Sequence, residues 1–143
     1  MLRAVIDPGV LVSALLTPAG SPAQLYMRWL AGEFELVACP QLLGELDRIL
    51  RRPKFRRYAT GEEVDRYVAV LRGGASMAPD PPPSPGLTRD PADDYLVALA
   101  REAAVDCLVT GDADLTSLVE LSPPVWSPAA FLARLDAGPR GSG

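Results

Sequence analysis

Leu2-Arg3-Ala4-Val5-Ile6-Asp7 is a short apolar run that ends in an acid, and Pro8-Gly9 follows it at once. An apolar run of this length predicts a buried strand of a parallel sheet, although it can be helical by pattern alone. Pro8-Gly9 predicts a break between this strand and the next helix. Short runs of a similar kind recur downstream and predict four more strands, at 34–38, 75–78, 105–110 and 124–126.

The segments between these strands carry helical periodicity and helix-start signals. Ser21 followed by Pro22 predicts an N-cap and a first helical residue, and Thr60 with Glu63 resembles a capping box. Five prolines between residues 79 and 85 predict a stiff surface loop. The predicted helices span 10–16, 21–31, 40–52, 61–72, 90–104, 115–121 and 128–135.

The alternation of strands and helices implies right-handed βαβ units and a parallel sheet covered on both faces. The predicted fold class is therefore α/β, a three-layer α/β/α sandwich with a central parallel sheet of four to five strands. A chain of 143 residues, 48% of them hydrophobic, fits one packed domain. We assign residues 1–137 to that domain and residues 138–143 to a frayed tail.

The expected cellular location of the protein and the state of its cysteines follow from signals that the sequence lacks. Its apolar runs fall short of the ~18–20 residues of a membrane span, and Asp7 comes too early for a signal peptide. The cytoplasm is therefore the expected location. Cys39 and Cys107 are isolated, without a Cys-x-x-Cys motif, which predicts buried free thiols rather than a disulfide.

The chain contains no histidine, which excludes Ser-His-Asp and Cys-His nucleophile systems, imidazole bases and His-ligated zinc. Any hydrolysis must therefore use carboxylates, hydroxyls, Lys, Arg or metal ions. The net charge is −4, from 14 basic and 18 acidic residues. This charge excludes a globally basic nucleic-acid binder but leaves room for a local basic patch.

Acidic side chains follow two of the predicted strands. Asp7 ends the first strand, and Asp112 follows the fourth. Ligands of parallel sheets bind beyond the carboxyl ends of the strands, so these two carboxylates converge if the strands are neighbours. Asp114 is either a further acid of the site or the N-cap of the helix that comes next. Thr110 could add a hydroxyl, although a Thr at a strand end is more often plain β structure.

Glu45 lies in the middle of the predicted helix 40–52, beside its apolar stripe. A carboxylate in that place is costly unless it is paired or bound to a metal ion. Glu45 is therefore either part of a site or a boundary residue that reaches solvent or pairs with Arg48 or Arg52.

Three acids open the predicted helix 90–104 and differ in their expected roles. Asp90 precedes Pro91 and is a natural N-cap, while Asp93 can complete a capping box. Asp94 has no such structural role, so we take it as the functional acid, with Asp93 as the substitute. Several convergent carboxylates cannot all stay ionised without a cation, and their hard oxygens favour Mg²⁺ or Mn²⁺.

Four segments carry a family resemblance: VIDPGVLVSALL (5–16), CPQLLGELDRILRRPKFRRY (39–58), TRDPADDYLVALA (88–100) and LVTGDADL (108–115). In order and spacing they resemble the PIN-domain ribonuclease family, and more narrowly the toxin subunit of a toxin–antitoxin pair in that family. The resemblance covers nearly the whole chain, from about residue 2 to residue 135. Each short acidic motif is weak alone, and the combination is what is specific.

The resemblance implies a sandwich of helices around a parallel sheet, Mg²⁺ or Mn²⁺ dependence and hydrolysis of single-stranded RNA. It also implies a homodimer and an antitoxin that blocks the site. The catalytic acids that it implies are, in family order, Asp7, Glu45, Asp94 and Asp112. The metal ligands that it implies are Asp7, Asp94, Asp112 and the nearby Asp114.

One departure from the family pattern lies beside the first acid. The family usually reads Asp-Thr-Asn after the first strand, and this chain reads Asp7-Pro8-Gly9. The turn therefore lacks a hydroxyl and an amide that could order the surroundings of a metal ion, and Pro8 has no backbone donor. Such losses often reduce metal affinity or activity about 10–100-fold. Ser13 is a candidate replacement for the hydroxyl.

A basic segment begins in the last turn of the predicted helix 40–52 and continues beyond it. Its cations, all within ten residues, are Arg48, Arg51, Arg52, Lys54, Arg56 and Arg57. Its cations can hold phosphates, and the interleaved Phe55 and Tyr58 can stack on bases. The segment can equally be a solvated face in which Arg favours the C-terminus of the helix. The predicted RNA-binding residues are Arg51, Arg52, Lys54 and Arg56.

The leading hypothesis is therefore a metal-dependent endoribonuclease for single-stranded RNA. The alternative is a catalytically weak PIN-like domain that acts as a binding partner, suggested by the Asp7-Pro8-Gly9 turn. A carboxylate phosphatase with Asp7 as nucleophile would need a second acid two residues on, where Gly9 stands. A receiver domain is disfavoured because no mid-chain phosphoacceptor ends a convincing third strand.

Overall fold

The computed structural model describes residues 1–83, 91–112, 116 and 122–138. Its strands form one parallel, five-stranded sheet in the order β3-β2-β1-β4-β5. The strands are β1 (Arg3–Ile6), β2 (Glu35–Ala38), β3 (Ser76–Met77), β4 (Cys107–Val109) and β5 (Val125–Trp126). The helices are α1 (Pro8–Leu16), α2 (Ser21–Leu30), α3 (Pro40–Leu50), the 3₁₀ helix η1 (Pro53–Phe55), α4 (Gly61–Gly74), α5 (Pro91–Glu102) and α7 (Pro128–Ala137).

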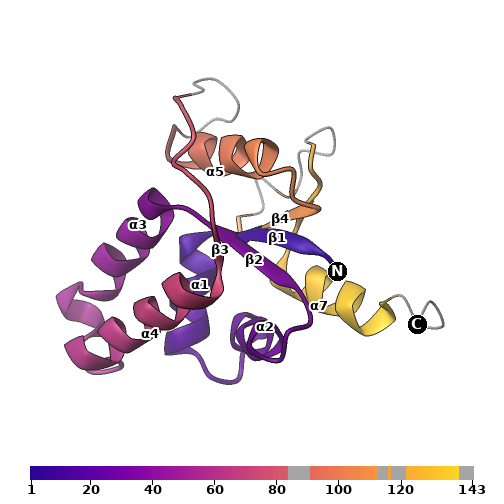
Figure 1. Cartoon of the computed structure of the whole chain (residues 1–143). Helices are drawn as coiled ribbons and strands as arrows, with labels where there is room; N and C mark the ends of the chain where they lie inside the picture. The colour runs from indigo at the N-terminus through magenta and orange to yellow at the C-terminus, as the bar shows by residue number, and fades with distance from the viewer. Residues whose placement is uncertain (84–90, 113–115, 117–121, 139–143) are drawn as a thin grey trace.

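Helices cover both faces of the sheet (Figure 1). α5 lies over one face, where it contacts β1 and β4, and α1, α2 and α7 lie over the other. α3 and α4 pack against each other to one side. β1 is in the middle of the sheet, and its residues Ala4 and Val5 are inaccessible to solvent. This arrangement confirms the predicted three-layer α/β/α sandwich, with five strands.

Two helix starts differ from their predictions. α1 begins at Pro8 rather than at residue 10, because Asp7 accepts a hydrogen bond from the Gly9 N–H at 2.8 Å and acts as the N-cap. Pro8 then occupies the first helical position, where no N–H is needed. α2 begins at Ser21, with Gly20 in the N-cap position and no side-chain cap. The predicted Ser21 cap is therefore wrong.

Other helix ends agree more closely with the sequence signals. Thr60 and Glu63 make both hydrogen bonds of a capping box at the start of α4. The Ser127 hydroxyl accepts a hydrogen bond from a backbone N–H in the first turn of α7. α3 ends at Leu50, two residues earlier than predicted, and Pro53 disfavours helical conformation in the residue before it.

Both cysteines are free and buried, as predicted. Burial raises the pKa of the Cys39 thiol to about 11 and that of the Cys107 thiol to about 12. Neither thiol therefore ionises at neutral pH, which makes both of them packing residues rather than nucleophiles.

Several predicted features lie outside the described residues, namely the Asp90 cap, most of the helix 115–121 and the tail from residue 139 onward. The domain boundary at residue 137 therefore stays a prediction. No helix within the described parts of the chain is long and apolar enough to cross a membrane.

Candidate active site

The carboxyl ends of β1 and β4 lie side by side where the order of the strands changes direction. Ile6 pairs with Val109 across the two strands, and the Asp7 N–H donates to the Val109 carbonyl at 2.9 Å. The chain therefore leaves both strands at the same edge of the sheet. This confirms that the strands are neighbours, the condition for the predicted convergence of Asp7 and Asp112.

The Asp7 carboxylate is held by two hydrogen bonds. Its Oδ1 accepts from the Gly9 N–H at 2.8 Å, and its Oδ2 accepts from the Thr110 hydroxyl at 2.7 Å. Thr110 Oγ1 in turn accepts from the Asp112 N–H at 3.1 Å. Thr110 is fully buried, so this chain of bonds fixes the orientation of Asp7. Each carboxylate oxygen keeps a lone pair that could bind a cation.

Thr110 changes the interpretation of the Asp7-Pro8-Gly9 turn. The neighbouring strand supplies Asp7 with a hydroxyl that the turn itself lacks. Pro8 forfeits no helical hydrogen bond, because it occupies the first position of α1. The sequence signal for this role was the place of Thr110, two residues before an acid at a strand end. That signal was too general to distinguish a site residue from ordinary β structure.

A cavity of about 310 Å³ lies between this edge of the sheet and the starts of three helices. We call it the acid cavity, because Asp7 and Asp112 both line it. α1, α2 and α7 contribute Gly9, Pro22 and Pro128 from their first turns. The N-terminus of a helix carries partial positive charge, which favours an anion such as a phosphate. None of these three residues has a free N–H, because that of Gly9 donates to Asp7 and the two prolines have none. Ser13, the predicted replacement hydroxyl, also lines the acid cavity.

Glu45 is linked to α5 through Tyr95. The Tyr95 hydroxyl donates a hydrogen bond to Glu45 Oε2, and none of the ion pairs among the described residues involves Glu45. Burial, the bond to Glu45 and nearby negative charge, including that of Asp7, raise the pKa of the Tyr95 phenol well above its usual value. Tyr95 therefore lies within electrostatic reach of Glu45 and Asp7. Sequence analysis missed this residue, although it directly follows Asp94.

Asp94 is the acid that α5 buries. It is 6% exposed, whereas Asp93 is half-buried, and the choice of Asp94 as the functional acid stays a prediction. Asp114 lies outside the described residues. Within the described ranges, no three His, Cys, Asp or Glu side chains gather closely enough to hold a metal ion. The carboxylates that line the acid cavity suit a hard divalent cation by their chemistry, and the complete ligand set stays a prediction.

The predicted RNA-binding cations have different surroundings. Arg51 forms ion pairs with Asp47, at 3.0 Å, and with Asp65. Because Asp47 belongs to α3 and Asp65 to α4, Arg51 links the two helices. The contact of the four predicted cations with RNA stays a prediction. The other three side chains are exposed: Arg52, Lys54 and Arg56.

The PIN domain family matches this sequence over residues 3–114, a range that contains all five predicted acids. The chain belongs to the PIN domain family. PIN domains are generally nucleases, which agrees with a cavity that offers carboxylates and helix N-termini to a phosphodiester.

Comparison with known proteins gives relatives of this PIN domain. The uncharacterized protein MJ1680 of Methanocaldococcus jannaschii is 27% identical over 117 residues, 82% of this chain and 75% of the relative. The crystal structure of PAE2754 from Pyrobaculum aerophilum has a TM-score of 0.63 at 18% identity, over 96% of this chain and 91% of that one. The crystal structure of VapBC2 from Rickettsia felis, bound to a DNA fragment from its promoter, has a TM-score of 0.58 at 12% identity. The match covers 87% of this chain and 97% of that one. The two structures share the fold of this PIN domain.

Proposed function

We propose that this PIN domain is a metal-dependent endoribonuclease that hydrolyses single-stranded RNA. The observation that carries the proposal is the acid cavity, which is lined by two carboxylates and by first-turn residues of three helices. Carboxylates suit a divalent cation, and helix N-termini suit the anionic phosphodiester. The chain has no histidine to act as a base, so the proposal assigns the activation of water to such a cation.

The proposed catalytic acids are Asp7, Glu45, Asp94 and Asp112, and the proposed ligands of Mg²⁺ or Mn²⁺ are Asp7, Asp94, Asp112 and Asp114. When bound, the cation lowers the pKa of water and offsets negative charge on the phosphodiester. Thr110 and the Gly9 N–H hold the Asp7 carboxylate in one orientation. Tyr95 holds Glu45 in the same way from α5.

The RNA strand would approach over the basic segment. Arg52, Lys54 and Arg56 present exposed cations for its phosphates. Arg51 already pairs with two carboxylates, so we expect it to contribute less to RNA binding than the other three residues.

We further propose that the protein is the toxin of a toxin–antitoxin pair, works in the cytoplasm as a homodimer and is blocked by its antitoxin. The resemblance of its four segments to such toxins and the likeness of its fold to VapBC2 support this role. The two buried free thiols suit a reducing compartment.

The test is cleavage of a mixed single-stranded RNA by the purified protein, with and without Mn²⁺. We expect cleavage that needs Mn²⁺, and a loss of more than about 100-fold in Asp94→Asn, because even groups around metal ligands are worth about 10–100-fold. Asp93→Asn is the matched control, since it removes the neighbouring charge and should keep most of the activity. Equal activity in the two variants would refute the assignment of Asp94.

A second candidate is a catalytically weak PIN domain that acts as a binding partner. The observation in its favour is the Asp7-Pro8-Gly9 turn, where the family usually has Asp-Thr-Asn. This candidate predicts no Mn²⁺-dependent cleavage above that of an Asp7→Asn, Asp94→Asn double variant. The hydroxyl that Thr110 directs at Asp7 is the reason we prefer the active enzyme.

A further inference from the structure

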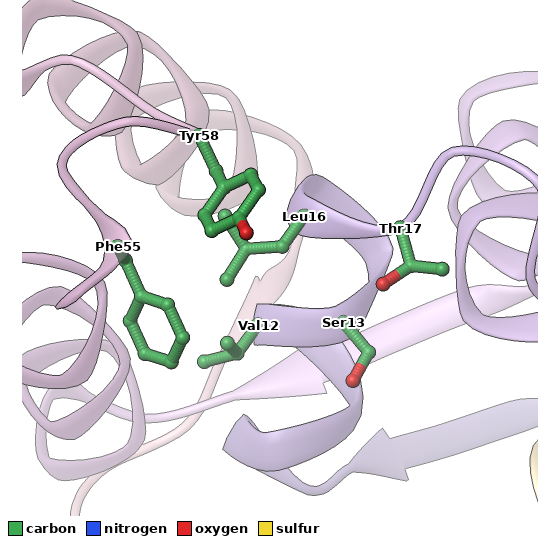
Figure 2. Close-up of a pocket in the computed structure, with 6 residues that line it drawn as sticks. All are labelled: Val12, Ser13, Leu16, Thr17, Phe55 and Tyr58. Atoms are coloured by element: carbon green, nitrogen blue, oxygen red, sulfur yellow. The ribbon is translucent and has the colours of Figure 1, made fainter.

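A second cavity, of about 400 Å³, lies between α1 and the segment that follows α3 (Figure 2). We call it the aromatic cavity, and it is lined by Val12, Ser13, Leu16, Thr17, Phe55 and Tyr58. Figure 2 shows the two rings facing Val12 and Leu16, while Ser13 and Thr17 lie on the other side of α1 in this view. Mostly apolar walls with a few polar groups, and a volume of roughly 300–1,000 Å³, are typical of small-ligand sites.

The aromatic cavity adjoins the acid cavity. Ser13 lines both of them. Asp7 caps the start of α1 and Leu16 ends it, and the nine residues of this helix rise only about 14 Å. A chain-like ligand that follows α1 would therefore reach both cavities.

The Tyr58 ring is accessible, the Phe55 ring is partly buried against the core, and both rings lie beside cations. Tyr58 is 59% exposed, so the fold makes little use of its ring. Lys54 Nζ lies 5.0 Å from the centre of the Phe55 ring, and the Arg57 guanidinium lies 5.9 Å from that of Tyr58. Proteins hold single-stranded nucleic acids with such pairs, because bases stack on the rings while cations attract the phosphates.

We propose that the aromatic cavity binds one base of the RNA strand whose phosphodiester lies in the acid cavity. Tyr58 stacks on the base, and the apolar side chains of Val12 and Leu16 pack against it. Lys54 and Arg57 attract the phosphates on either side. The proposal rests on the proposed ribonuclease function and adds a base-binding subsite to it. An apolar peptide would compete for the same rings, but the flanking cations and the shared Ser13 favour RNA.

The test measures the binding of a fluorescently labelled single-stranded RNA to the full chain in EDTA, where metal-dependent hydrolysis is suppressed. A series of oligonucleotides, each with one abasic position, identifies the base that the cavity holds. At one position we expect the loss of the base to raise the Kd of the wild-type protein about 5- to 150-fold, the effect of losing one stacked base. In Tyr58→Leu the same abasic change should leave the Kd unaltered.

Tyr58→Leu is the informative variant, because it keeps an apolar side chain and removes the ring. Tyr58→Trp is the matched control and should keep the affinity of the wild type. The exposed position of Tyr58 predicts that both variants fold, which thermal unfolding checks. Equal RNA affinity in the wild type and Tyr58→Leu would overturn the proposal. Weak RNA binding by Tyr58→Ala together with full RNA binding by Tyr58→Leu would also overturn it. An apolar side chain without a ring would then suffice, which would favour an apolar peptide as the occupant.

This result is separable from the ribonuclease activity. The binding assay contains no metal ion, so base-dependent binding is measurable even in a protein that does not cleave RNA. Conversely, Mn²⁺-dependent cleavage with an unchanged KM in Tyr58→Leu would leave the ribonuclease standing and remove the base-binding subsite.

Discussion

The two ends of α1 face two different kinds of surface. At its N-terminus, the acid cavity is built on parallel strands, and a buried hydroxyl and a backbone N–H fix the Asp7 carboxylate. Toward its C-terminus, the aromatic cavity is lined by an exposed ring, and surface cations lie beside that ring. The rigid end suits chemistry, which needs carboxylates held in one geometry. The exposed end suits recognition, which needs accessible rings and charges.

If the two ends of α1 have separate roles, Asp7→Asn should abolish cleavage and spare RNA binding. We expect RNA cleavage to fall by more than about 100-fold, because the variant removes a proposed metal ligand. The stability of the fold should change little, since Asn caps a helix as well as Asp does. Cleavage assays with Mn²⁺ and thermal unfolding check the two parts separately. RNA binding in EDTA should be retained, and a parallel loss of binding and cleavage would show that the two ends are not distinct.

Thr110→Val tests whether the rigid end depends on its buried hydroxyl. Valine keeps the shape of threonine but leaves Asp7 Oδ2 and the Asp112 N–H without their shared partner. We expect activity to fall about 10–100-fold and the free energy of unfolding to fall by about 1–3 kcal/mol. Thr110→Ser keeps the hydroxyl and is the control for both measurements. Full activity in Thr110→Val would mean that Gly9 alone orients Asp7.

The combined variant Lys54→Gln, Arg56→Gln tests whether cations near the exposed end of α1 contact RNA phosphates. Each phosphate contact contributes about 0.7 to the slope of log affinity against log salt for single strands, so the double variant should flatten that slope by about 1.4. Titrations of RNA at several salt concentrations measure this effect. Arg51→Gln is the comparison, because Arg51 pairs with Asp47 and Asp65. It should lose little stability and change the slope less than the loss of Arg56 does.

Much of the fold was predictable because local chemistry and tertiary structure agree. The buried strands read as short apolar runs, and the Thr60 to Glu63 capping box formed as predicted. The sequence also predicted that Asp7 and Asp112 follow strands, and the order of the strands in the sheet then brings them to one cavity. The start of α1 was missed although Asp7-Pro8 has the same N-cap and first-position pattern as Ser127-Pro128.

The hydrogen bonds that orient the acids of the site could not be predicted from the sequence pattern. Thr110 reaches Asp7 across 103 positions of the chain, and Tyr95 reaches Glu45 across 50. Periodicity indicates which face of an element is buried, but it does not indicate which side chain of another element lies opposite. The aromatic cavity was missed for the same reason: Phe55 and Tyr58 were visible in the basic segment, and their apolar partners on α1 were not.

A calorimetric titration with Mn²⁺ asks whether this PIN domain binds a metal ion at all, because the proposed function depends on carboxylates that hold one. The wild-type protein and the Asp7→Asn, Asp94→Asn double variant are titrated side by side at neutral pH. We predict saturable binding to the wild type and heats no larger than those of dilution for the double variant. Indistinguishable titrations of the two proteins would contradict a metal site built on these acids.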